Sequence, residues 1–122
     1  MKKTLAILSV IFLASACHHQ EHLCRSYYGV LPAADAPGIQ TTVTFQAPDR
    51  YRNRLVFIDK SNGSFEETGR YRLQDDILTL TDSAGEQSFY RLEPNQIRRL
   101  DMEKQPITGT LAEHYVLKCT VK

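Results

Sequence analysis

Short alternations of apolar and polar residues follow one another along the chain behind residue 24. Successive side chains of a strand point to opposite faces, so this period of two predicts β-strands, and no window keeps the period of a helix. The apolar faces that we expect are Tyr28 and Val30 with Cys24, Ile39 to Phe45, Tyr51 to Phe57, Tyr71 and Leu73, Leu78 and Leu80, Tyr90 and Leu92, and Tyr115 to Val121. The pattern indicates an all-β domain.

Turn-forming residues separate these segments and predict how the strands are joined. Asn62-Gly63 is the favoured pair for a tight hairpin, and Gly85 stands where a left-handed residue closes another hairpin. Consecutive strands should therefore pair in antiparallel fashion. Between Pro94 and Gly109 the period of two is lost, so we expect a bulge or a short irregular link there.

The beginning of the chain has the pattern of an export signal. Lys2 and Lys3 precede an apolar run from Leu5 to Ala16, which ends on small residues that a signal peptidase accepts. The run is shorter than the roughly 20 apolar residues of a membrane-spanning helix. We therefore expect residues 1–16 to be a signal peptide that is removed.

The residue that follows this cleavage site is Cys17. Ala14-Ser15-Ala16 suits ordinary cleavage, but together with Cys17 it resembles a lipobox, the signal for lipid attachment to bacterial lipoproteins. We favour the lipoprotein pathway, which makes Cys17 the lipidation site and the membrane a partner. Residues 17–24 would then be a lipidated tether in the cell envelope, followed by the barrel domain, residues 25–122.

The three cysteines of the chain are an odd number for an exported protein. If Cys17 carries lipid, Cys24 and Cys119 are left as a pair, and two thiols in the oxidising envelope are usually bridged. This disulfide would place the last strand, His114 to Val121, beside the first. The expected fold is therefore a small antiparallel β-barrel closed by a disulfide, without exposed sheet edges.

Charge and catalytic motifs exclude two classes of function. The chain has 15 Lys and Arg against 14 Asp and Glu, and loss of Lys2 and Lys3 leaves the mature chain close to neutral, so we expect no nucleic-acid partner. No serine stands in a nucleophile elbow, no carboxylate pair is marked by spacing, and His114 is the one histidine of the expected barrel. We expect a protein that is not an enzyme.

Two separated stretches carry a resemblance to a known family. Gly29 to Thr41 reads GVLPAADAPGIQT, and Leu78 to Arg91 reads LTLTDSAGEQSFYR. In this order they resemble the NlpE N-terminal domain family of outer-membrane lipoproteins, associated with copper resistance and envelope stress. Leu100-Asp101 and Pro106-Ile107 are similar to the strand and turn that follow in that family, so the likeness covers most of the mature chain.

This resemblance implies a lipocalin-like barrel on an outer-membrane lipoprotein that binds or senses an envelope component and has no enzymatic activity. Its motif loop contains Pro32, Asp35 and Gly38. The family's loop usually carries a Cys-x-x-Cys pair, and those positions are Ala33 and Ala36 here. Thiolates select Cu(I) and provide redox chemistry, so neither property carries over to this loop.

Three histidines in the expected tether, His18, His19 and His22, offer an alternative function. Imidazoles suit Cu(II) and Zn(II), so the tether could handle copper or zinc in a chain for which we otherwise expect no cofactor. We favour a simple polar tether, because binding a metal would require a flexible segment to become ordered.

Five arginines recur at alternate positions and should lie on the outer face of two strands. They are Arg50, Arg52, Arg54, Arg70 and Arg72. This basic surface could meet an acidic lipid, a polysaccharide or an acidic envelope protein, but we favour a solvated face neutralised by nearby carboxylates.

A third alternative is a carrier of a small hydrophobic molecule. The candidate lining residues are Tyr28, Phe45, Phe57, Tyr71 and Tyr90. Side chains generally fill the interior of a small barrel, so we expect these residues to be core.

Overall fold

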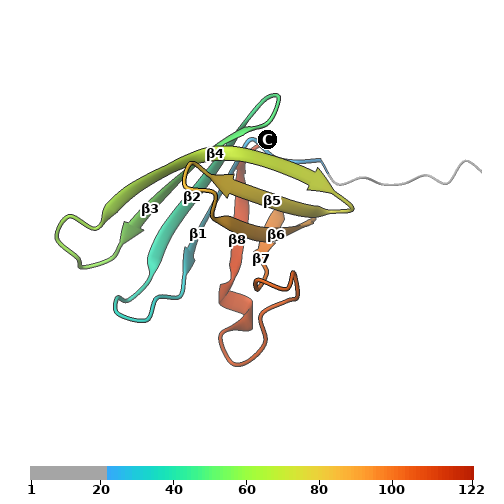
Figure 1. Ribbon diagram of the computed structural model, residues 1–122. Coiled ribbons are helices and arrows are strands. Elements are labelled where there is room, and N and C mark those ends of the chain that lie inside the picture. Colours follow the sequence, from blue (N-terminus) through green and yellow to red (C-terminus); the bar gives the residue numbers. More distant parts are fainter. Residues whose placement is uncertain (1–21) are drawn as a thin grey trace, which may run out of the picture.

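The computed structural model describes residues 22–122 as a closed barrel of eight antiparallel strands that follow one another in sequence order (Figure 1). A 3₁₀ helix, η1 (Ala112–His114), precedes the last strand. No helix in this range is long and apolar enough to cross a membrane. The predicted all-β barrel is confirmed. Its strands are β1 (Ser26–Leu31), β2 (Ile39–Gln46), β3 (Arg50–Phe57), β4 (Ser64–Gln74), β5 (Ile77–Asp82), β6 (Gln87–Glu93), β7 (Gln96–Arg99) and β8 (Val116–Val121).

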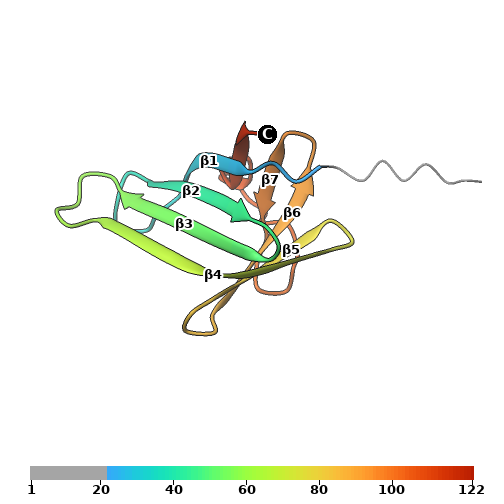
Figure 2. The ribbon, with the colours of Figure 1, turned by 90° about the horizontal axis from the view of Figure 1, so that it is seen from above.

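The two ends of the barrel differ in what they carry. The start of β1 and the C-terminus lie together at one end, and the β1–β2 loop and the loop that contains η1 lie at the other (Figure 1). Seen from above, β2, β3 and β4 lie side by side in one curved layer, and β6 and β7 cross it steeply (Figure 2). We name the end with Cys24 and Lys122 the tether end, and the end with Leu31, Ile39 and Leu55 the distal mouth.

Large apolar side chains fill the interior of the barrel. Val43, Leu78, Tyr90, Ile97 and Leu117 have no exposed surface at all. Full burial of one such aliphatic side chain is worth about 1.5–3 kcal/mol, so these inward positions supply much of the stability of a domain of this size. The expected inward faces of β2, β3, β5 and β6 are confirmed by this core.

The disulfide between Cys24 and Cys119 joins the first and last strands. β1 and β8 pair in antiparallel fashion, with Tyr27 opposite Cys119. The backbone N–H of Cys24 donates a hydrogen bond of 2.7 Å to the Tyr27 hydroxyl, which secures the segment before β1 to the buried ring. The predicted disulfide and the predicted closure of the barrel are both confirmed.

The predicted inward face of β1 is wrong. Tyr27 is 1 % exposed, whereas Tyr28 and Val30 point outward and are 40 % and 43 % exposed. The inward face contains Gly29, which gives no apolar signal, and its close approach to β8 leaves no room for a side chain. An irregularity between Ser26 and Tyr27 also shifts the register with β8. Cys24 is buried as well, although it lies three residues before Tyr27 and a regular strand would place the two side chains on opposite faces.

β4 turns a corner of the barrel at Gly69. This strand pairs with β3 as far as Arg70 and with β5 from Gly69 onward. A Cβ atom added at Gly69 would lie 2.0 Å from the carbonyl oxygen of Thr81 and 2.8 Å from the Cα of Asp82. The absence of a side chain therefore permits the close backbone approach on which the corner depends.

The two predicted hairpin turns have different outcomes. Gly85 has a φ of +83°, and the Asp82 carboxylate accepts hydrogen bonds from the N–H groups of Ala84 and Glu86, so this turn is confirmed. The prediction of a tight turn at Asn62-Gly63 is wrong. Residues 58–63 form a longer loop, in which Asn62 has a positive φ and Gly63 does not. Gly63 is required there by packing, since an added Cβ would lie 2.9 Å from the carbonyl oxygen of Phe57.

The segment between Pro94 and Gly109 contains the irregular link that its pattern predicts. After the short strand β7, Leu100 forms an isolated bridge with Pro106, and Asp101 accepts hydrogen bonds that hold the intervening turn. This turn places the Lys104 Nζ atom 5.2 Å from the centre of the Phe89 ring. The last strand begins at Val116 and not at His114, as we expected, because His114 belongs to η1.

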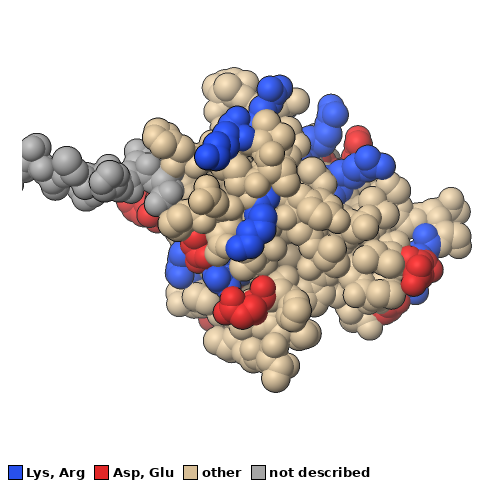
Figure 3. All heavy atoms as spheres, turned by 180° about the vertical axis from the view of Figure 1, so that it is seen from behind, with Lys and Arg blue, Asp and Glu red and all other residues tan. Residues whose placement is uncertain are grey.

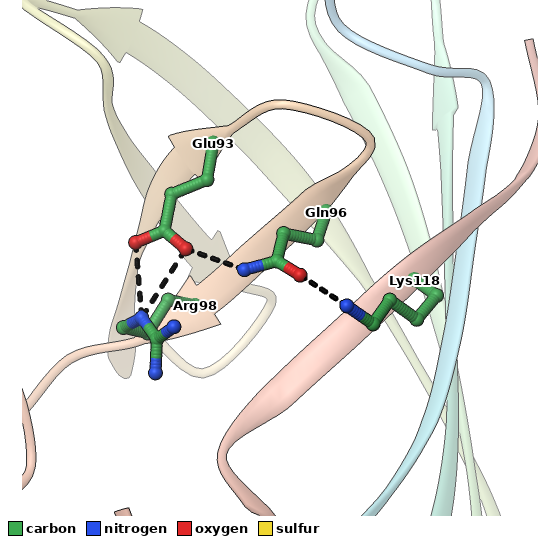
Figure 4. A network of polar contacts seen from close by, with 4 residues as sticks. All are labelled: Glu93, Gln96, Arg98 and Lys118. Carbon is green, nitrogen blue, oxygen red and sulfur yellow. Dashed lines mark hydrogen bonds and ion pairs between the residues drawn. The ribbon is translucent and has the colours of Figure 1, made fainter. Parts of the chain in front are cut away.

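A polar network on the outer surface fixes β7 between its neighbours (Figure 4). The Arg98 Nε donates to both carboxylate oxygens of Glu93, at 3.2 and 2.9 Å, while Gln96 donates to Glu93 and accepts from Lys118. Burial raises the pKa of Glu93, but the hydrogen bonds from Arg98 and Gln96 outweigh it, so the pKa lies below its ordinary value. The network links β6, β7 and β8.

Candidate functional site

A cavity of about 240 Å³ lies in the distal mouth. Leu31, Ile39 and Leu55 form its apolar side, where β1 and β3 end and β2 begins. The cavity is smaller than the roughly 300–1,000 Å³ of typical sites for drug-sized ligands. It suits a small molecule or a single inserted side chain.

Asn53 is the unusual polar residue of this cavity. It lies on the inward face of β3, opposite Val43 of β2 and Glu67 of β4, and it is 7 % exposed. Its Oδ1 atom is buried and accepts no hydrogen bond from any described residue. A buried acceptor without a donor costs about 1–3 kcal/mol, so the fold retains Asn53 at a cost to its own stability.

We expect Asn53→Leu to raise the free energy of unfolding by about 1–2 kcal/mol, because leucine has a similar volume and brings no unpaired polar atom. Urea unfolding of the two proteins at the same pH measures the difference. Thr42→Ala, an outward-facing change on the adjacent strand, is the control for a general effect on this sheet. A loss of stability in Asn53→Leu would show that the amide is satisfied.

Two tyrosines and an arginine form the inner wall of the cavity. Burial, and after it the carboxylates of Glu67 and Asp82, raise the pKa of Tyr51 from 10.0 to about 12. Arg99 donates a hydrogen bond of 3.3 Å to the Tyr90 hydroxyl, and its guanidinium carbon lies 5.3 Å from the centre of the Tyr90 ring. Tyr51 is therefore neutral at physiological pH, and Arg99 is held against the wall of the cavity by Tyr90.

The Tyr51 hydroxyl should make the fold sensitive to alkali. Its pKa is higher in the folded state than in the unfolded state. The neutral hydroxyl therefore contributes its full share to the free energy of unfolding below pH 10, and this share is lost as the pH rises towards 12. The free energy of unfolding should fall by up to about 1.4 kcal/mol per pH unit in this window. Urea unfolding of wild type and Tyr51→Phe across the window measures the effect, which should be smaller in the variant. Equal slopes would contradict it.

Carboxylates outnumber cations around the cavity. Glu67, Asp82 and Glu86 line it together with Arg99. Neither Glu67 nor Glu86 forms an ion pair with another described residue, and Asp82 holds the β5–β6 turn through its Oδ1. The cavity is therefore rich in negative charge and in hydrogen-bond acceptors.

The motif loop, residues 32–38, borders the same end of the barrel. Gly38 is buried beneath Val30, where an added Cβ would lie 2.5 Å from the Val30 Cγ1, and its carbonyl accepts from the N–H of Ile58. Asp35 lies 4.0 Å from the Nζ of Lys60, and both side chains are well exposed, so this ion pair contributes little stability. Pro32 and Pro37 line a shallow apolar surface near η1.

The five predicted arginines do lie outward and exposed. Arg50 stands opposite Arg70, Arg54 stands opposite Glu66, and the Arg70 Nη1 lies 3.8 Å from Asp49. On the face drawn in Figure 3, basic side chains stand apart from one another, and acidic side chains lie on the same face. The arrangement resembles a solvated surface, and a role in binding stays a prediction.

The structure gives little support to the two alternative sites. His22 is exposed, His18, His19 and Cys17 lie outside the described residues, and residues 22–122 contain no group of His, Cys, Asp and Glu arranged to hold a metal ion. Ala33 and Ala36 supply no copper ligand either, so the described part of the chain does not fit a copper centre. The histidine tether stays a prediction.

The five aromatic residues of the hydrophobic-carrier hypothesis do not line one common cavity. Phe45 and Tyr71 pack against each other at 4.8 Å towards the tether end, and Phe57 packs on Phe65 at 5.7 Å in the β3–β4 hairpin. Tyr28 points outward, which leaves Tyr90 alone beside the cavity. The expectation that these five rings are core is confirmed for Phe45, Tyr90 and, at the edge of the core, Tyr71. It is wrong for Tyr28 and Phe57, which lie outside the core.

The sequence profile of the NlpE N-terminal domain matches residues 27–110. The chain belongs to this family. Lipoprotein NlpE of Escherichia coli (strain K12) is 35 % identical over 85 residues, which are 68 % of this chain and 36 % of that protein. The 17 kDa lipoprotein of Treponema pallidum (strain Nichols) is 32 % identical over 108 residues, 79 % of this chain and 69 % of that protein.

Two crystal structures of NlpE-like chains share the fold. One, described as a lipoprotein from Shewanella oneidensis, superposes with a TM-score of 0.71 at 36 % identity, covering 82 % of this chain and 91 % of the other. The Cpx pathway activator NlpE from E. coli superposes with a TM-score of 0.67 at 32 % identity, covering 72 % of this chain and 47 % of the other. The match therefore spans about a third of E. coli NlpE and just under half of its crystallised chain.

Proposed function

We propose that the chain is a lipid-anchored protein of the bacterial outer membrane that acts in envelope signalling by binding a partner at its distal mouth. The observation that carries this proposal is the opposite placement of the two ends of the barrel. A lipid on Cys17 would hold the tether end near the membrane, since only six residues lie between Cys17 and Cys24. The cavity and the motif loop would then face away from that membrane.

The chemistry of the cavity supports binding rather than catalysis. Its lining contains no histidine, cysteine or lysine, so it offers no cysteine or lysine nucleophile and no histidine that could activate Ser88. The related proteins are named as lipoproteins, and one of them as an activator of the Cpx pathway. A non-enzymatic role in Cpx-type signalling agrees with the lining of the cavity and with the names of the related proteins.

The test is expression of the whole chain, with its signal peptide, in E. coli that lacks its own NlpE. We expect the protein to incorporate radiolabelled palmitate, to sediment with outer membranes and to raise a Cpx-dependent reporter when overproduced. Cys17→Ser is the matched control, because Ala14-Ser15-Ala16 still permits ordinary cleavage and the barrel would be released without lipid. This variant should lose the label and the membrane location.

The outcomes separate the parts of this proposal. An unlabelled Cys17 in the wild-type protein would overturn the anchor. An anchored protein that leaves the reporter at its background level would overturn the signalling role and leave the anchor intact.

A further inference from the structure

The polar groups in the cavity share one property, which is that they accept hydrogen bonds. Asn53 Oδ1 has no donor, and the Glu67 carboxylate on the directly opposite position of β4 has no ion-pair partner among residues 22–122. The Thr41 hydroxyl already donates to the carbonyl of Ile39 at 3.1 Å, so only its lone pairs remain available. Directly opposite residues in an antiparallel pair have Cβ atoms about 4.5–5.5 Å apart, so Asn53 and Glu67 can reach a single ligand atom.

The charged groups around these acceptors favour a ligand of positive charge. Glu67, Asp82 and Glu86 provide three carboxylates, whereas the single cation, Arg99, donates to Tyr90 and lies over its ring. An anion would meet three like charges and a set of acceptors that cannot bind it. A cation that also donates several hydrogen bonds would satisfy both the charge and the unpaired amide oxygen.

We propose that the cavity binds a primary ammonium group, which donates to Asn53 Oδ1 and to the Glu67 carboxylate. An ammonium carries three donors and no acceptor, which matches the acceptors that converge here. Leu31, Ile39 and Leu55 on the other side of the cavity contact the carbon chain attached to the nitrogen. This inference rests on the proposed binding role and names its ligand class.

The same chemistry can come from two sources. A free alkylamine fits a cavity of about 240 Å³ as a whole molecule. The side chain of a lysine exposed on a partner protein presents the same ammonium at the end of a four-carbon chain. The two sources differ in what else contacts the rim of the distal mouth, so they can be separated by comparing a free amine with a peptide.

The experiment uses the mature lipoprotein purified in detergent and titrated by calorimetry with n-butylamine, with n-butanol and with butyrate. We expect n-butylamine to bind at least tenfold more tightly than the other two. Asn53→Leu and Glu67→Gln should each weaken its binding at least tenfold. Glu66→Gln, the adjacent carboxylate on the outward face of β4, should leave binding unchanged.

A second titration, with the blocked peptide Ala-Lys-Ala, identifies the source. Tighter binding of the peptide than of n-butylamine assigns the site to a partner lysine, and weaker binding assigns it to a free amine. Absence of n-butylamine binding, equal binding of butyrate, or an unchanged affinity in Glu67→Gln would each overturn the inference. Glu67→Gln is a rim substitution, so it keeps the test decisive even where Asn53→Leu changes the fold. If n-butylamine does not bind but the Cpx reporter is raised, the ammonium site is overturned and the proposed function is not.

Discussion

The free energy of unfolding should fall by roughly 3–5 kcal/mol when Cys24 and Cys119 are both replaced by alanine. The two residues are 95 positions apart, so their bond restricts nearly the whole unfolded barrel. In the folded state it also joins the start of β1 to β8, where the barrel closes. Urea unfolding at neutral pH measures the difference between the oxidised wild type and the double variant.

Reduced wild-type protein is the matched control for this prediction. It should unfold at nearly the same urea concentration as the double variant, because both lack the covalent link and keep similar side-chain volumes. If the double variant lost less than about 1 kcal/mol, the disulfide would be incidental and the hydrogen bonds of β1 and β8 alone would close the barrel.

Gly69→Ala should destabilise the barrel by about 2–3 kcal/mol, the second large effect that we expect. The new Cβ would lie 2.0 Å from the carbonyl oxygen of Thr81, which is a backbone atom and cannot rotate away. β4 and β5 must then separate at the corner where β4 changes its pairing partner. The measurement is again the urea midpoint, with the slope of the transition to confirm two-state behaviour.

Thr68→Ala is the matched control on the same strand, because Thr68 is exposed and lies outside the close approach. Its effect should stay below about 1 kcal/mol, the range of strand propensities. Equal losses in Gly69→Ala and Thr68→Ala would show that the corner tolerates a side chain.

Much of this fold could be predicted from the alternation of apolar and polar residues. On β2 the residues Ile39, Thr41, Val43 and Phe45 repeat with a period of two, and the register confirms that they share the inward face. β1 could not be predicted in this way. Its inward face contains a glycine, its outward residues Tyr28 and Val30 are apolar, and an irregularity next to Tyr27 shifts the pairing.

The long-range closure of the barrel was predictable because chemistry, and not periodicity, specified it. Once Cys17 is assigned to lipid, one pair of cysteines remains, and that pair joins the first and last strands. The 3₁₀ helix and the start of β8 were not predictable, because Tyr115 and Leu117 continue the alternation of the strand into a segment whose backbone follows η1.

The candidate site was only partly visible in the sequence. Asn53 interrupts an otherwise apolar face, and a polar residue at an inward position was the available signal. Glu67 and Arg99 carried no signal, since Glu67 comes from β4 and Arg99 from the end of β7, and only the register of the closed barrel brings them to one cavity. The predicted arginines were recognised by spacing, which places them on a face but does not give a ligand.

Site-specific photo-crosslinking in intact envelopes tests most directly whether the distal mouth is the binding end. A crosslinking amino acid is placed at Leu55 in the mouth or, as the comparison, at Gln46 at the tether end of β2. We predict a discrete adduct with one envelope protein from position 55 in cells with an active Cpx response, and none from position 46. Adducts from position 46 alone, or equal adducts from both positions, would contradict the account.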